Sequence, residues 1–207
     1  GQGLPERLRR DVFLQSEYEM VILPARITRE EEYLRQPRPG RGVRLNRAAR
    51  RAVWAVVSAY RAAALQDDTI DFAEAAMIAA THLEHSGTRQ AQHVLVDEGQ
   101  DFKPCHWHLV RALVAPQDND IFIVEDSHQR IYGNKVVLSH HGIQIRGRAA
   151  KLRLSYRTTA ENLEFAVRIL EGHTFTDSDG QEDSLDGYLS ARTGPRPQVE
   201  SCPSPAE

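Results

Sequence analysis

The segment HVLVDEGQDF, residues 93–102, is the most informative part of the sequence for the fold. Its apolar run, Val94 to Val96, stops abruptly at the acids Asp97 and Glu98. A short, unbroken apolar run is typical of a strand buried in a parallel sheet. Carboxylates at the end of such a strand can hold hydrated Mg²⁺ and activate water for nucleotide hydrolysis. Solvated acids at a strand end would look the same, so this pair by itself leaves both interpretations open.

A helix and a second strand follow this segment. Pro104 suits the first turn of a helix, and residues 121–124 form another apolar run that ends in acids. In such a strand–helix–strand unit the two strands run parallel, and their carboxyl ends meet at the edge where open α/β sheets bind ligands. The acids of both strands and one glutamine are therefore expected at one site: Asp97, Glu98, Asp126 and Gln129.

Two helices are expected before residue 90. Asn46 is placed to cap a helix whose apolar residues recur at helical spacing, after the loop RQPRPGRG at residues 35–42. Asp71 and Glu74 have the spacing of a reciprocal capping box, ahead of an alanine-rich helix that runs to about Glu84. The first third of the chain is therefore expected to be mainly helical.

A third alternating segment, KLRLSYR at residues 151–157, predicts another strand. Thr158 and Glu161 have capping-box spacing at the start of the helix that follows, and Gly172 ends that helix. The remaining residues are polar and rich in Gly, Pro and Asp, so they are expected to form loops.

Composition excludes several classes of protein. The sequence has no run of about 18 apolar residues that would mark a membrane span, and two cysteines cannot make a disulfide framework. A reducing cytoplasm fits best. The first 65 residues carry a net charge of +6 and the remainder −9. A nucleic-acid contact joined to a metal–nucleotide site would show this asymmetry, as would solvated charge on unrelated faces.

Five arginines are candidates for contacts with DNA phosphates: Arg41, Arg44, Arg47, Arg50 and Arg51. A solvated helix face would explain them equally well. Cys105, His106 and His108 lie close together after the first strand, but they lack the spacing of a zinc site, so packing and surface roles are expected for them.

Three motifs together resemble those of UvrD/Rep-like superfamily 1 DNA helicases. They are DEGQD at residues 97–101, EDSHQRIY at residues 125–132 and YR at residues 156–157, just before a predicted helix. The resemblance covers residues 93–170. It implies an α/β fold: a partial RecA-like P-loop NTPase motor domain with parallel strands, plus a helical accessory region. The corresponding division is an accessory region at residues 1–90, the motor core at 91–150 and the start of a second motor domain at 151–207.

The resemblance also implies roles for individual residues. Asp97 would bind Mg²⁺, Glu98 would be the general base, and Asp126 would join the nucleotide-binding residues. Gln100 and Gln129 would sense the γ-phosphate of ATP, Tyr156 would stack on adenine, and Arg157 would contact the γ-phosphate. Tyr132 would lie toward the DNA. The implied protein is a bacterial cytoplasmic helicase that uses ATP and Mg²⁺ on single-stranded or partly duplex DNA, with no membrane contact and with protein partners unknown.

The sequence also departs from the family pattern. Glu125 stands where glycine is usual, Ser155 stands where asparagine is usual, and no lysine follows a glycine, so the phosphate loop GxxxxGK[ST] has no candidate. We therefore expect an internal helicase segment that does not hydrolyse ATP by itself. One alternative is a stand-alone remnant that binds DNA or a protein partner without hydrolysis. Another is a metal-dependent nuclease or phosphatase, which leaves Gln129, Tyr156 and Arg157 unexplained.

Overall fold

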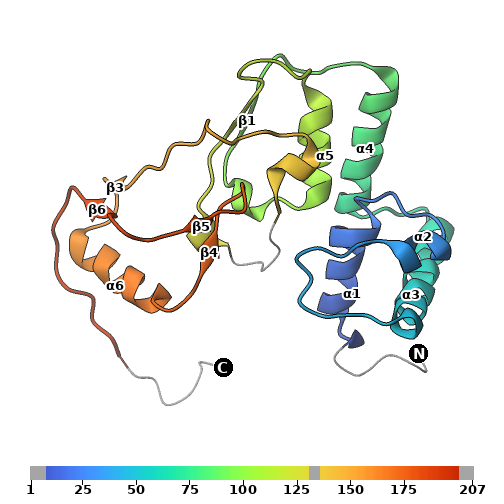
Figure 1. Cartoon of the computed structure of the whole chain (residues 1–207), viewed down its shortest axis with the longest axis horizontal. Coiled ribbons are helices and arrows are strands. Elements are labelled where there is room, and N and C mark those ends of the chain that lie inside the picture. Colours follow the sequence, from blue (N-terminus) through green and yellow to red (C-terminus); the bar gives the residue numbers. More distant parts are fainter. Residues whose placement is uncertain (1–7, 131–135, 201–207) are drawn as a thin grey trace. The chain divides into compact units, whose positions relative to one another are not determined.

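The computed structural model describes residues 8–130 and 136–200. The chain divides into two compact units, Gly1–Gln144 and Ile145–Glu207 (Figure 1). Among the described helices, none combines the length and the hydropathy that crossing a bilayer would require.

The first unit is mainly helical, as the sequence predicted for its first part. Its α-helices in the described residues are α1 (Asp11–Glu17), α2 (Glu30–Arg35), α3 (Arg47–Gln66), α4 (Phe72–Ser86) and α5 (Pro104–Leu113). A π-helical turn, η2 (Tyr18–Ile22), continues α1. Three 3₁₀ turns follow later: η3 (Gly99–Asp101), η4 (Ser127–Gln129) and η5 (Leu138–His141).

Both predicted N-cap residues of this unit are confirmed, whereas the reciprocal bond expected from Glu74 to the Asp71 backbone is not formed among the described residues. The Asn46 side chain accepts a hydrogen bond from the Ala49 amide at 2.8 Å, and Asp71 accepts one from the Glu74 amide at 2.7 Å. Each bond satisfies an amide that has no partner within its own helix. The Glu74 carboxylate accepts a hydrogen bond from the Tyr18 hydroxyl, so it ties α4 to the start of η2.

The helices share an apolar core to which α5 also contributes. Buried residues of this core include Ile22, Tyr33, Val53 and Met77, together with Cys105 from α5. Farther along, α4 packs beside α5 and the two helices bury Ala80, Leu83 and Ala112 (Figure 1). The helices on either side of residue 90 therefore pack into one unit. The division into residues 1–90, 91–150 and 151–207 stays a prediction.

A fully buried carboxylate holds the loop between α2 and α3. Glu17 is 0% exposed and accepts hydrogen bonds from the Tyr33 hydroxyl at 2.8 Å, from Arg38 Nη2 at 2.6 Å and from Arg41 Nε at 3.2 Å. A buried charge is tolerated only when it is paired and hydrogen-bonded, and here two guanidinium groups supply the opposite charge. Arg38 also donates to the Val43 carbonyl, which fixes the path of the loop.

The predicted parallel pair of strands is confirmed, but its predicted burial is wrong on one face. β1 (Val94–Val96) pairs in parallel with β2 (Ile121–Ile123). Val96 is 4% exposed, whereas Leu95 is 77% and Phe122 is 62% exposed. Parallel sheets normally have both faces covered. Here Trp107 of α5 lies close to Gly99, beside Ile123, the residue that pairs with Val96, and the described residues leave the Leu95 face open.

The second unit contains one helix and short strands. β3 (Leu154–Ser155) pairs in parallel with β6 (Leu189–Ser190), and β4 (Phe175–Thr176) pairs antiparallel with β5 (Glu182–Asp183). The strand predicted at residues 151–157 is thus confirmed only over two residues. The prediction that the segment after Gly172 is all loop is wrong at these short strands. An Asp177 carboxylate that accepts from the Asp179 and Gln181 amides closes the β4–β5 turn.

The predicted cap of the last helix is displaced by one residue. α6 (Ala160–Leu170) begins after Thr159, whose hydroxyl accepts a hydrogen bond from the Asn162 amide at 3.4 Å. Thr158 as the cap is therefore wrong. Glu161 also does not complete the expected box, because its carboxylate accepts a hydrogen bond from the Gly194 amide at 2.7 Å. The position of Gly194 after β6 could not be read from local spacing.

Two histidines of the first unit pack together in a partly buried position. The rings of His108 on α5 and His141 at the end of η5 meet edge to face, with 5.0 Å between their centroids. Burial, with smaller contributions from His108 and His140, lowers the pKa of His141 to about 4. Burial and then the charge of Arg26 lower the pKa of His108, and Glu84 opposes this shift.

These lowered pKa values predict that the first unit loses stability as the pH falls below about 6.5. The unfolded chain then binds protons that the folded chain excludes, so each histidine contributes stability that is complete above its unfolded pKa and declines as the pH falls toward its folded pKa. The free energy of unfolding should fall by up to about 1.4 kcal/mol per pH unit for each histidine. Urea unfolding of the wild type and of His141→Gln between pH 7 and about pH 4 measures this directly.

In His141→Gln the pH dependence should be weaker than in the wild type. His82→Gln is the matched control, because His82 is exposed on α4 and does not contribute to the pKa shift of His141, and it should retain the wild-type profile. Equal pH dependence in all three proteins would show that His141 does not titrate with folding.

Candidate functional site

The pairing of β1 with β2 brings the two predicted acidic segments to one edge of the sheet. Val96 lies opposite Ile123, and the Val124 amide donates to the Val96 carbonyl at 2.8 Å. The pairing continues past the strands, because the Gly99 amide donates to the Val124 carbonyl at 2.9 Å. The turns after both strands are thus joined by their backbones.

Glu98 has an unusual backbone conformation at this edge. Its φ is +52°, in the left-handed region that non-glycine residues rarely adopt. Such a residue costs of order 1 kcal/mol or more and persists only where its surroundings impose it, as often happens at functional sites. The Asp97 carboxylate accepts a hydrogen bond from the Glu98 amide at 3.0 Å. Both side chains are exposed to solvent.

Gly99 is a residue of this site that the sequence reasoning missed. A Cβ atom at this position would lie 3.0 Å from Ile123 Cγ2 and 3.4 Å from Trp107 Cη2. Glycine therefore permits the close approach of the turn to β2 and α5. The residue lies inside the DEGQD motif, but the need for glycine follows mainly from Ile123 on the neighbouring strand, which no local pattern connects to it.

Gln100 links the two acidic turns. It is 8% exposed, and its Nε2 donates to Glu98 Oε2 at 2.7 Å while its Oε1 accepts from the Asp126 amide at 2.9 Å. Both ends of the side-chain amide are thus engaged within the protein. One side chain orients the carboxylate of Glu98 and positions the backbone that follows β2.

Asp126 organises the second turn. Its Oδ2 accepts a hydrogen bond from Gln129 Nε2 at 2.7 Å, and its Oδ1 accepts from the His128 amide at 3.0 Å. The His128 ring is nearly buried, at 6% exposure, with Nδ1 3.3 Å from Asp126 Oδ1. His128 was not identified from the sequence, where a single histidine in a polar stretch gives no signal. Glu98, Gln100, Asp126 and Gln129 form one hydrogen-bonded path, in which the Gln100 side chain meets the backbone amide of Asp126 and the other two links join side chains.

The donor set at this edge fits Mg²⁺ only when the ion brings other ligands. Within residues 8–130 and 136–200, no three carboxylate, imidazole or thiolate side chains are gathered closely enough to hold a metal by themselves. Mg²⁺ commonly uses one or two carboxylates and takes its remaining ligands from water and substrate phosphates. Asp97, exposed at the strand end, can serve in this way. A nuclease-type cluster of Asp97, Glu98 and Asp126 receives no support.

The remaining predicted nucleotide ligands lie in the second unit. Tyr156 and Arg157 follow β3 and precede α6, and both are exposed, with Tyr156 at 71%. The Ser155 hydroxyl accepts a hydrogen bond from the Thr158 amide at 3.2 Å, which shapes the turn that carries them. Tyr132 lies outside the described residues.

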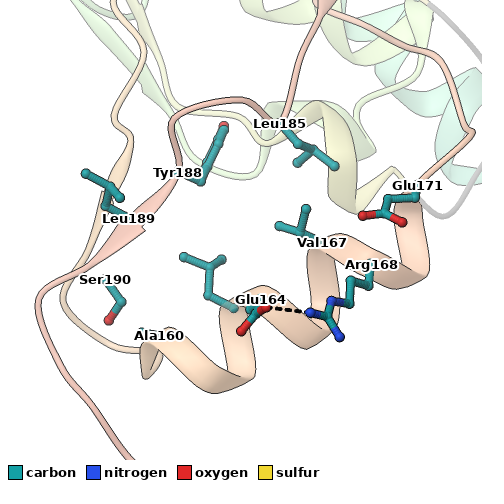
Figure 2. Close-up of a pocket in the computed structure, with 10 residues that line it drawn as sticks. Ala160, Glu164, Val167, Arg168, Glu171, Leu185, Tyr188, Leu189 and Ser190 are labelled. Carbon is teal, nitrogen blue, oxygen red and sulfur yellow. Dashed lines mark hydrogen bonds and ion pairs between the residues drawn. The ribbon is translucent and has the colours of Figure 1, made fainter.

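The second unit also contains a cavity of about 500 Å³ beside α6. Figure 2 shows Val167, Leu185 and Leu189 around it, with the Glu164–Arg168 ion pair, 2.6 Å long, on α6. Tyr156 and Arg157 do not line this cavity. Its lining offers apolar contact rather than the set of cations that would bind a triphosphate.

The five arginines predicted to contact DNA differ in their surroundings. Arg41 donates to Glu17 and Ser16, and Arg51 donates to Glu30 at 3.1 Å. Arg50 donates to two backbone carbonyls. Arg44 and Arg47 are exposed, and no described residue forms a hydrogen bond or an ion pair with either.

The cysteine–histidine group after the motif has packing roles, as expected. Cys105 is fully buried, and burial raises the pKa of its thiol to about 11. His106 Nδ1 accepts a hydrogen bond from the Lys103 amide at the start of α5, and burial lowers the pKa of this histidine.

Comparison with known proteins agrees with this arrangement. A search of curated protein sequences gives no match to the chain. A family model described as the UvrD/REP helicase N-terminal domain matches residues 15–136, which is more than half of the 207 residues and includes both acidic turns. That family has a RecA-like α/β fold, consistent with the parallel β1–β2 pair and its crossover helix. The chain belongs to the UvrD/REP helicase family.

Proposed function

We propose that this chain supplies the metal-binding and catalytic carboxylates of an ATP-dependent helicase that moves along single-stranded or partly duplex DNA. The observation that carries this proposal is the hydrogen-bonded path from Glu98 through Gln100 and Asp126 to Gln129. It connects the residue proposed to activate water with the residue proposed to sense the γ-phosphate. Membership of the helicase family supports the reaction class.

In this proposal Asp97 holds Mg²⁺ together with the phosphates of ATP. The ion would neutralise charge on the phosphates. Glu98 accepts the proton of the attacking water with one carboxylate oxygen, while Gln100 holds the other oxygen. Gln129 is exposed, and its side-chain amide donates to Asp126 Oδ2. It can exchange that bond for one to a phosphate oxygen.

The geometry favours a positioning role for Gln100. Direct sensing of the γ-phosphate would require one end of its amide to leave Glu98 or the Asp126 backbone, and a buried amide without its partner costs about 1–3 kcal/mol. We therefore propose that Gln100 transmits movement of the second turn to Glu98. Asp126 contributes by holding Gln129 rather than by binding nucleotide itself.

Tyr156 and Arg157 would complete the nucleotide site from a second motor domain that begins near residue 151. Exposure of both side chains on one turn is compatible with contact to a ligand. ATP turnover also needs a phosphate-binding loop, for which the sequence has no candidate. The chain by itself is therefore proposed to bind DNA without hydrolysing ATP. A cytoplasmic location remains a prediction.

Replacing Glu98 by glutamine tests the general base. In a helicase that contains this segment and a phosphate loop, Glu98→Gln should lower kcat by roughly 10²-fold or more, because the amide keeps the shape but cannot accept the proton. ATP binding should be largely retained, since the introduced side-chain carbonyl can still accept a hydrogen bond from Gln100. Steady-state ATPase kinetics and nucleotide-binding titrations measure the two effects.

The matched control for the general base is Asp118→Asn. It makes the same chemical change at an exposed position before β2 and should leave kcat unchanged. A Glu98→Gln enzyme with more than about a tenth of wild-type kcat would exclude the base role.

Arg157 and Tyr156 should give different kinetic effects in the same enzyme. Arg157→Ala and Arg157→Lys should each lower kcat by at least about a hundredfold, because a fixed guanidinium stabilises charge on the transferring phosphate. Tyr156→Ala should mainly raise KM for ATP, because it removes a stacking interaction worth on the order of 1 kcal/mol. The assay is ATP hydrolysis at saturating single-stranded DNA, with DNA affinity measured separately without nucleotide. If Arg157→Ala weakened DNA binding but spared kcat, the residue would belong to the DNA site.

A further inference from the structure

A positively charged cavity of about 350 Å³ lies between α2 and the start of α3. Three arginines and one glutamate line it, together with two leucines: Arg35, Arg47, Arg50, Glu31, Leu34 and Leu45. Three positive charges thus face one negative charge. The cavity is separate from the carboxylates at the ends of β1 and β2, which do not contribute to its lining.

Two of these arginines are available to a ligand. The side chains of Arg35 and Arg47 are exposed, and no described residue forms a hydrogen bond or an ion pair with either guanidinium group. The neighbouring acids of α2 are already engaged, because Glu30 pairs with Arg51 at 3.1 Å and Glu32 pairs with Arg29 at 2.7 Å. Glu31 is then the one carboxylate among the lining residues that opposes these charges.

The third arginine is held in place without being neutralised. Arg50 Nη1 donates to the carbonyls of Tyr33 and Gln36 at 2.7 and 2.8 Å, and its guanidinium lies 5.6 Å from the centroid of the Tyr33 ring. These carbonyls belong to the last turn of α2 and the residue after it, and the Tyr33 carbonyl also accepts a hydrogen bond from the Gln36 amide at 3.2 Å. Because both acceptors are uncharged, the guanidinium keeps its positive charge in a fixed orientation. The N-terminus of α3 adds partial positive charge nearby.

We propose that this cavity binds a phosphate of a nucleic-acid backbone through Arg35, Arg47 and Arg50. Guanidinium groups match phosphate oxygens with paired N–H donors, and positive charge dominates affinity for nucleic acids. The choice of nucleic acid as the source of the phosphate rests on the proposed function. The proposal separates these arginines from Arg41 and Arg51, whose charges are paired with Glu17 and Glu30.

The test is binding of a fluorescently labelled single-stranded oligonucleotide to this chain, followed by anisotropy at several salt concentrations. The double variant Arg35→Ala/Arg47→Ala should bind roughly tenfold more weakly at low salt. The slope of log affinity against log salt should become shallower by about 0.7 for each phosphate that is no longer neutralised. Circular dichroism and Tm should match the wild type, because neither side chain has a partner in the described protein. Arg47→Gln, which retains a polar side chain, should give about half of the decrease in log affinity.

The matched control is Arg10→Ala/Arg146→Ala. It removes the same charge from two exposed arginines that do not line the cavity, and its affinity should stay within about threefold of the wild type. Equal weakening in the two double variants would overturn the proposal in favour of diffuse attraction. Failure of the wild type to bind at low salt would also overturn it. Inorganic phosphate should compete with the oligonucleotide more strongly than chloride at equal ionic strength, whereas binding of inorganic phosphate without any binding of the oligonucleotide would overturn the nucleic-acid assignment. None of these outcomes bears on hydrolysis, which depends on Glu98.

Discussion

The parallel pairing of β1 with β2 is the constraint on which the candidate site depends. Because Val96 lies opposite Ile123, the two strands end at the same edge of the sheet. The Gly99 amide can therefore reach the Val124 carbonyl at 2.9 Å. Gln100 can then span the two turns with the two ends of one amide. A shift of either strand by one residue would turn its side chains to the opposite face and separate these partners. The left-handed backbone of Glu98 and the absence of a side chain at Gly99 are local consequences of this close approach.

The two proposed functional regions of the first unit use charge in opposite ways. At the sheet edge, acids are exposed and oriented by hydrogen bonds from amides, which leaves their charge available to a metal ion or to a proton. In the helical part, the buried Glu17 carboxylate forms ion pairs with Arg38 and Arg41. The Arg50 guanidinium instead donates hydrogen bonds to uncharged backbone carbonyls. A guanidinium held without neutralisation remains able to bind an anion. The buried ion pairs of Glu17 therefore stabilise the loop between α2 and α3. The arginines of the neighbouring cavity outnumber its one carboxylate, which leaves the cavity positively charged.

Features encoded locally could be predicted from the sequence, whereas features that depend on distant partners could not. The caps at Asn46 and Asp71 and the parallel strand pair follow from short patterns, and the structure confirms them. The cap of α6 was placed one residue too early, because two adjacent threonines satisfy the same local pattern and Glu161 binds the distant Gly194 amide. The prediction that Leu95 is buried is also wrong, because the burial of a strand residue depends on which elements cover the sheet. Likewise, sequence spacing gives no sign that Glu17 neutralises Arg41 or that Ile123 favours glycine at position 99. The roles of the site residues remain predictions, although their assembly at one edge is observed.

Paramagnetic broadening by Mn²⁺, used in place of Mg²⁺, tests most directly whether the sheet edge is one metal-binding site. The side-chain amide signals of Gln100 and Gln129 should broaden together as Mn²⁺ is added to the chain. The amide of Gln117, which lies before β2 at the opposite end of the strand and donates to the Gln92 carbonyl, should broaden much less. Asp97→Ala should abolish the selective broadening of the Gln100 and Gln129 signals. The remaining signals should keep their wild-type positions, which shows that the fold is intact. Similar broadening of all three glutamines, or unchanged selective broadening in Asp97→Ala, would contradict the assignment of this edge as the metal site.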